Sequence, residues 1–163
     1  MSQAEQIRNA RRSGQHEEAC TLAVALAAKS PNDFELQYEA ACVHDFLGRE
    51  AQAVPYYLAA LAGDLSSDKL RGAYLGLGST FRTLGQYIDA EKVLREGLAR
   101  FAGAAELKTF LAMTLHNLGQ SKQAVEMLLT LLAQSSTDTH IQVYREAILL
   151  YAQDIEKTWS DAV

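Results

Sequence analysis

The stretch Thr83–Ala90, TLGQYIDA, decides the fold because its pattern occurs three more times along the chain. The other copies are RSGQHEEA at 12–19, FLGREAQA at 46–53 and NLGQSKQA at 117–124. Each copy has an alanine five residues after its glycine, and Gly14, Gly48, Gly85 and Gly119 are 34, 37 and 34 residues apart. This regular spacing predicts an array of similar units, and an ordinary helical bundle with chance spacing is the weaker alternative.

The glycine and the alanine of each copy serve different physical needs. Glycine accepts a left-handed backbone conformation without a Cβ clash, and the methyl side chain of alanine allows two helices to approach closely. We therefore predict a tight turn at each glycine and a helix crossing at each alanine. The pairs are Gly14 and Ala19, Gly48 and Ala53, Gly85 and Ala90, and Gly119 and Ala124.

The 34-residue period, the turn glycine and the trailing alanine resemble the tetratricopeptide repeat, a helix-turn-helix unit. The likeness is strongest in the third copy, weakest in the first, and suggests a short bacterial-type member of the family. It implies an all-α, right-handed superhelical array of about four units in a single domain. The units are expected at residues 1–33, 34–70, 71–104 and 105–138, with a capping helix at about 139–160.

Apolar periodicity places the helices within these units. The predicted pairs are 2–13 and 16–29, 33–47 and 50–62, 68–84 and 87–101, and 105–118 and 121–134. Side chains at 32–33 and at 66–68 are suited to cap the second and third A helices, the first helix of each pair. Pro55 falls inside a helix, and the three extra residues between Gly48 and Gly85 are expected to lengthen the 63–66 connection.

Thr137-Asp138-Thr139 reads as the cap of one long final helix, whose apolar face includes Tyr144 and Ile155. Stacked repeats leave an apolar face on the last unit, so a solvating helix at this end is expected. We expect Trp159 to anchor that helix by packing.

Composition and charge exclude several classes of partner. The net charge is -5 and the Lys and Arg residues are scattered, which disfavours a nucleic acid or an anionic membrane surface. The longest apolar runs, such as 128–133, are too short to span a bilayer. Cys20 and Cys42 form no CxxC pair, so buried thiols in a reducing, cytoplasmic setting are expected.

No constellation of residues in the sequence points to catalysis, a metal or a cofactor. The four histidines lie in four different stretches, and no HExxH, GxSxG or Walker-type motif occurs. Gly72, Gly76 and Gly78 suit the interior of the third A helix better than a phosphate loop, because no strand precedes them. Cys42 and His44 point in different directions on a helix. The chain is therefore predicted not to be an enzyme.

The resemblance implies a concave groove lined by the A helices. Its expected residues are Arg8, Arg11, Tyr38, Cys42, Asp45, Leu75, Ser79, Arg82, Thr109, Met113 and His116. The Lys, Asn and Arg with which some family members clamp a peptide carboxylate are absent. A peptide with apolar anchors at Tyr38, Leu75 and Met113 is the expected ligand, although Leu75 and Met113 could instead cover neighbouring helices. The alternative is self-association, as a homodimer or in a chaperone-like role.

Overall fold

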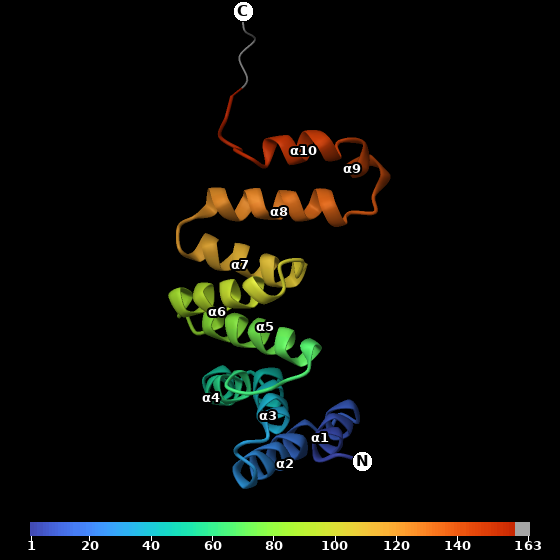
Figure 1. Cartoon of the computed structure of the whole chain (residues 1–163), viewed down its shortest axis with the longest axis vertical. Coiled ribbons are helices and arrows are strands. Elements are labelled where there is room, and N and C mark those ends of the chain that lie inside the picture. Colours follow the sequence, from blue (N-terminus) through green and yellow to red (C-terminus); the bar gives the residue numbers. More distant parts are fainter. Residues whose placement is uncertain (159–163) are drawn as a thin grey trace, which may run out of the picture.

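The computed structural model describes residues 1–158, which contain ten α-helices and no β-strand (Figure 1). The helices are α1 Gln3–Arg12, α2 His16–Lys29, α3 Phe34–Phe46, α4 Glu50–Leu61, α5 Ser67–Thr83, α6 Tyr87–Arg100, α7 Ala105–Asn117, α8 Ser121–Ser135, α9 Thr139–Val143 and α10 Arg145–Tyr151. The predicted bounds of the first eight helices agree with these to within one residue at each end. The all-α repeat fold is thereby confirmed.

The helices stack in chain order along the long axis of the molecule, with the N-terminus near one end and α10 near the other (Figure 1). Each of α1 to α7 packs against the helix that follows it, and α8 packs against α10. The A helices α1, α3, α5 and α7 also contact one another in sequence. This second set of contacts forms a continuous row of A helices.

The four turn glycines all adopt the left-handed conformation predicted for them. Their φ angles are +79° at Gly14, +68° at Gly48, +76° at Gly85 and +79° at Gly119. The four paired alanines are buried at the helix crossings, with Ala19, Ala53 and Ala90 fully inaccessible and Ala124 3% exposed. A side chain larger than a methyl group at these positions would force the two helices of a pair apart.

The extra residues between Gly48 and Gly85 lie mainly in a helix, so the prediction that they lengthen the 63–66 connection accounts for only a small part of them. The connection after α4 is only one residue longer than the four-residue connections after α2 and α6. Helix α5 instead has 17 residues, against 13 in each of α3 and α7. Asp68 lies in the first turn of α5, where the positive end of the helix dipole stabilises a carboxylate.

Side-chain caps are present at two of the three predicted sites. Asp33 accepts from the Leu36 N–H at 3.1 Å, and Asp138 accepts from the His140 N–H at 2.8 Å. Ser66 occupies the N-cap position of α5 but its hydroxyl accepts no capping bond. Pro55 lies inside α4, as predicted.

The C-terminal segment consists of two short helices followed by a non-helical stretch that runs back toward α8. The prediction of one helix over 139–160 was therefore wrong. Tyr144, at φ -98° and ψ 6°, interrupts the helix, and α10 ends at Tyr151. The chain then turns toward the start of α8, where Lys122 pairs with Asp154 at 2.6 Å and Glu126 accepts from the Ile155 N–H at 3.2 Å. These contacts require the chain to leave the helix. Trp159 lies outside the described residues.

Two clusters of buried side chains form the core. The first joins α1, α2 and α3 and consists largely of small residues, with Ile7, Leu36 and Val43 as its largest members. The second runs from α3 to α8 and contains the leucines Leu77, Leu94, Leu107, Leu111 and Leu115.

Glycines in α5 allow close packing on three neighbours. A Cβ at Gly72 would collide with the Tyr38 hydroxyl, one at Gly76 with Tyr57, and one at Gly78 with Leu94. The interpretation of these glycines as helix-interior residues, with Gly78 at a crossing, is confirmed.

Candidate functional site

The predicted groove residues come from three positions of the repeat, which lie ten, six and three residues before the turn glycine. The structure places them all on the row of A helices: Arg8 and Arg11 on α1, Tyr38, Cys42 and Asp45 on α3, Leu75, Ser79 and Arg82 on α5, and Thr109, Met113 and His116 on α7. Because the A helices contact one another in order, these residues follow one another along one row.

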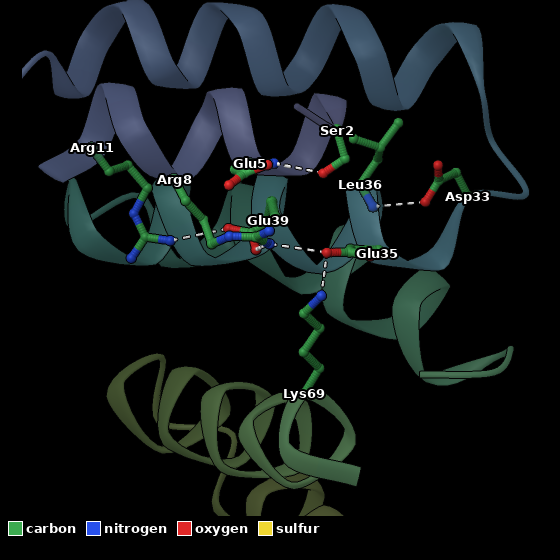
Figure 2. A network of polar contacts seen from close by, with 9 residues as sticks. All are labelled: Ser2, Glu5, Arg8, Arg11, Asp33, Glu35, Leu36, Glu39 and Lys69. Carbon is green, nitrogen blue, oxygen red and sulfur yellow. Dashed lines mark hydrogen bonds and ion pairs between the residues drawn. The ribbon is translucent and has the colours of Figure 1, made fainter. Parts of the chain in front are cut away.

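A charged network ties α1, α3 and α5 together (Figure 2). Arg8 donates to Glu35 at 2.9 Å and to Glu39 at 2.6 Å, and Arg11 makes a longer contact of 3.4 Å with Glu39. Lys69, from the start of α5, pairs with Glu35 from the other side. Hydrogen bonds from Lys69 and Arg8 lower the pKa of Glu35 below its usual value. Two of the predicted groove arginines are therefore held by carboxylates of the neighbouring A helix.

Asp45 lies where α3, α4 and α5 meet. Its two carboxylate oxygens accept from the Tyr57 hydroxyl and the Thr80 hydroxyl, each at 3.1 Å. Burial raises the pKa of Asp45, and it also raises the pKa of Tyr57. The Tyr57 hydroxyl lies 3.9 Å from the Cys42 thiol as well. No cation pairs with the Asp45 carboxylate in the described part of the chain.

Two adjoining cavities lie at the end of the A-helix row formed by α1 and α3. One, of about 370 Å³, is lined by Arg11, Cys42, Asp45, Phe46 and Tyr57. The other, of about 270 Å³, is lined by Arg8, Arg11, Arg12, His16 and Phe46. Arg11 and Phe46 border both cavities, so the two are adjacent, and together we call them the turn-end groove. The Phe46 side chain is 61% exposed there although it is large and apolar.

The structure brings Arg8, Arg11, Cys42 and Asp45 together in the turn-end groove and leaves the other predicted residues outside it. Tyr38 is half-buried, with its ring 6.4 Å from that of Tyr57 and its hydroxyl against Gly72. Leu75 packs against the larger core cluster, and Met113 is half-buried on α7.

The remaining predicted groove residues satisfy their polar groups locally. Ser79 donates to the Gly76 carbonyl, and Thr109 donates to the Ala105 carbonyl. Arg82 donates to the Asn117 side chain at 2.9 Å, which links α5 to α7. The His116 Nδ1 lies 2.9 Å from the Ser121 hydroxyl.

Phe46, Tyr57, Arg12 and His16 line the turn-end groove but were missed by sequence reasoning. A signal for Phe46 existed, because the position two residues before the turn glycine holds Arg12, Phe46, Thr83 and Asn117 in the four copies. One aromatic residue at an exposed repeat position that is polar in the other three copies indicates a role that is specific to that unit, such as binding. Tyr57 carried no such signal because it lies on α4, outside the row of A helices.

The cysteines and histidines in residues 1–158 lie in separate local contacts. Cys42 contacts Tyr57, whereas His44 stacks on Tyr56 at 5.3 Å and lies 3.8 Å from the Cys20 thiol. Both thiols are free, and no cluster of three metal-binding side chains occurs in this range. None of the helices there combines the length and apolarity needed to cross a bilayer.

Comparison with known families decides what kind of array this is. The model of the tetratricopeptide repeat family matches residues 34–155. The chain belongs to the tetratricopeptide repeat family. The match leaves out α1 and α2, whose turn at Gly14 nevertheless has the same positive φ as the other three turns. Repeats of this family are protein-interaction scaffolds, so a role in binding proteins follows for the array at this level.

Solved structures share the fold of this tetratricopeptide array at low sequence identity. A MamA structure, "MamA RS-1 ArsTM double mutant", has a TM-score of 0.70 and 19% identity over 96% of this chain and 88% of its own. Kinesin light chain-like repeats from Podospora anserina have a TM-score of 0.66 and 23% identity over 92% and 83% of the two chains. A search of curated proteins finds no match. These likenesses support the fold and leave the ligand open.

Proposed function

We propose that the protein is a non-catalytic adaptor that binds a peptide or a segment of another protein along the row of A helices. The observation that carries the proposal is the turn-end groove with its exposed Phe46. An aromatic ring beside a cavity is a suitable apolar anchor for a partner side chain, and few residues usually provide most of the binding energy. The cavity of about 370 Å³ has room for one large side chain next to this ring.

The polar groups around Phe46 support recognition of a specific partner. Asp45 offers a half-buried carboxylate with its hydroxyl donors already in place, and Arg11 offers cationic donors on the opposite helix. Such groups, fixed before binding, favour one orientation of a peptide over others. Tyr38, Leu75 and Met113 extend the proposed contact surface along the A helices, and Tyr38 contributes mainly by supporting Tyr57.

The test is to select peptide ligands by display on the immobilised protein and to measure their affinities by calorimetry. Phe46→Ala is expected to weaken a selected peptide by about tenfold or more, since loss of an aromatic anchor costs over 1 kcal/mol. Ile88→Ala is the matched control, because Ile88 is also exposed, at 70%, but lines neither cavity. Equal losses in both variants, or none in Phe46→Ala, would refute groove binding.

Self-association is the second candidate, and it is favoured by the apolar C-terminal end of the array. Val143, Tyr144, Leu150 and Tyr151 are 44–77% exposed on α9 and α10. The opposite end presents polar residues of α1, such as Gln3, Glu5 and Gln6. An apolar end and a polar end do not match, so two C-terminal ends would meet in a closed two-fold dimer.

Light scattering at two protein concentrations tests this second candidate. A dimer through α9 and α10 gives a mass that rises with concentration, and Tyr144→Glu together with Leu150→Glu abolishes the rise. A mass of one chain at both concentrations rules the dimer out.

The proposal places this binding role in the cytosol. Cys20 and Cys42 are free thiols with separate partners, an arrangement that suits a reducing compartment. Cell fractionation with an antibody to the protein checks the location.

A further inference from the structure

The turn-end groove carries more positive charge than its neighbours neutralise. Arg8, Arg11 and Lys69 share two carboxylates, those of Glu35 and Glu39 (Figure 2). Arg12 follows Arg11 directly, is exposed, and has no ion-pair partner within residues 1–158. The cavity of about 270 Å³ is therefore lined by three arginines and by no carboxylate, in a chain whose net charge is -5, whereas the Asp45 carboxylate lines the other cavity. The local excess of positive charge is unusual for this molecule and attracts anions.

The carboxylates of the network are not available to repel an anionic ligand. The Glu39 side chain is only 3% exposed and is engaged by both Arg8 and Arg11. Glu35 is engaged by Arg8 and Lys69. Arg11 uses one terminal nitrogen for its 3.4 Å contact, which leaves most of its five N–H donors free, and the exposed Arg12 lines the same cavity. Arg11 and Arg12 therefore offer N–H donors to the cavity, whereas the carboxylates of Glu35 and Glu39 are already paired.

A second observation, independent of the arginines, concerns a polar atom of His16, a residue that lines the same cavity. The Nδ1 atom of His16 is buried and has no hydrogen-bond partner, the sole such side-chain atom in the described part of the chain. His16 lines the 270 Å³ cavity together with the three arginines. Its ring stacks at a tilt on Phe46, with centroids 4.4 Å apart, which fixes the imidazole in place. Buried polar atoms normally have a partner, and a bound group would supply one.

We infer that the smaller cavity binds an acidic side chain of the partner segment, a carboxylate or a phosphate, next to an apolar side chain that lies on Phe46. Charge-assisted bonds from the guanidinium groups of Arg11 and Arg12 provide the attraction, and His16 Nδ1 provides the additional polar contact. A cavity of about 270 Å³ has room for one such group and not for an extended polyanion. The inference rests on the groove-binding proposal, because it names the chemistry of the segment that the groove accepts.

The test uses three fluorescein-labelled, C-terminally amidated pentapeptides and measures binding by fluorescence polarisation at low salt. Their sequences are Glu-Glu-Phe-Glu-Glu, the same with Gln in place of Glu, and the same with phosphoserine in place of Glu. The first or the third peptide is expected to bind about tenfold or more tightly than the Gln peptide, and whichever is tighter identifies the anion as a carboxylate or a phosphate. The preference shrinks at 0.5 M salt, since exposed charges are screened.

Variants of the protein locate the effect. Arg12→Glu is expected to weaken the tighter acidic peptide about fivefold or more, and it is safe for folding because Arg12 is exposed. Arg100→Glu is the matched control, an exposed arginine that also lies in the last turn of its helix but far from the cavity. His16→Phe keeps a ring against Phe46 and removes Nδ1, so it weakens the acidic peptide and leaves the affinity for the Gln peptide unchanged.

The outcomes separate this inference from the groove proposal. Equal affinities for all three peptides, or equal losses in Arg12→Glu and Arg100→Glu, overturn the acidic preference. If all three peptides bind with equal affinity and Phe46→Ala weakens all of them, the groove proposal stands without the acidic preference. If none of the peptides binds at about 1 mM, which corresponds to a binding free energy weaker than about 4 kcal/mol, the inference is also overturned. The groove proposal is then decided by the display-selected ligands alone.

Discussion

The first helix pair and the middle of the array are held together in different ways. Around α1 to α3 the buried cluster contains five alanines among its nine residues, so the area that each side chain buries is small. From α3 to α8 five buried leucines and two buried tyrosines supply larger surfaces. The charged network of Arg8, Glu39 and Glu35 lies on the alanine-rich side. Polar bonds between A helices thus supplement a weak apolar core where the array begins.

This difference teaches that similar repeats need not be equally stable. In a linear array each unit contacts only its neighbours, so the stability of a unit depends on its own core and on its two interfaces. Within residues 1–158 the first pair packs against one neighbouring helix, α3, and that interface is alanine-rich. We expect α1 and α2 to open locally before the leucine-rich middle does.

Leu94→Ala should have the largest effect on stability. Leu94 is fully buried against Gly78, and its truncation leaves a cavity in the leucine-rich middle, at a cost of about 2–5 kcal/mol. Urea unfolding measures the loss, and hydrogen exchange should show that α5 to α7 lose protection. Leu36→Ala, in the alanine-rich cluster, should instead expose α1 and α2 first. The comparison between the two regions fails if both variants release the same helices.

Gly76→Ala should come next, because it acts at the close contact of α5 with α4, inside the leucine-rich region. The new methyl group would overlap Tyr57, which is 3% exposed and cannot move away freely, so we expect a loss of about 1–3 kcal/mol. Gly103→Ala is the control, since a Cβ there meets no atom within 4 Å. Thermal unfolding of the two variants checks this, and an unchanged midpoint for Gly76→Ala would contradict the close packing of α4 on α5.

Glu39→Gln should have a smaller and more local effect. The amide keeps the size of the side chain but loses the charge that Arg8 and Arg11 bind, and we expect a cost of about 1–2 kcal/mol. Hydrogen exchange should increase in α1 and leave α6 and α7 unchanged. Glu18→Gln, at an exposed site on α2, serves as the control. A uniform increase over all helices would mean that the network does not act locally.

The smallest expected effect is a pH dependence from Glu35. The pKa of Glu35 is lowered in the folded protein, so its ionised form stabilises the fold. This contribution is complete above the unfolded pKa of 4.5 and is lost as the pH falls through the lower, folded value. Urea midpoints between pH 6 and pH 3 measure it. Glu35→Gln should fall less steeply with acid than the parent protein, and identical slopes would exclude this role of Glu35.

The regular part of the fold was predictable from the sequence, and its departures from regularity were not. Periodicity and the turn glycines gave eight helices to within one residue because each signal acts within a single unit. The longer α5 and the interruption at Tyr144 have no counterpart in the repeated pattern, and the turn of the chain after α10 brings Asp154 to Lys122, which lies in another unit. The groove residues on A helices followed from their repeat positions. His16 and Tyr57, which lie on the second helices of their pairs, required the three-dimensional arrangement.

The added turn of α5 has a mechanical consequence. Lys69 lies on this turn, at a repeat position that falls in connecting loops before α3 and α7. Through Glu35 it links α5 to Arg8 of α1, so one line of charges spans three A helices. Because these ion pairs are partly exposed, salt screens them. We therefore expect the contacts among the first three A helices to loosen as the ionic strength rises, while the leucine-rich middle of the array changes little.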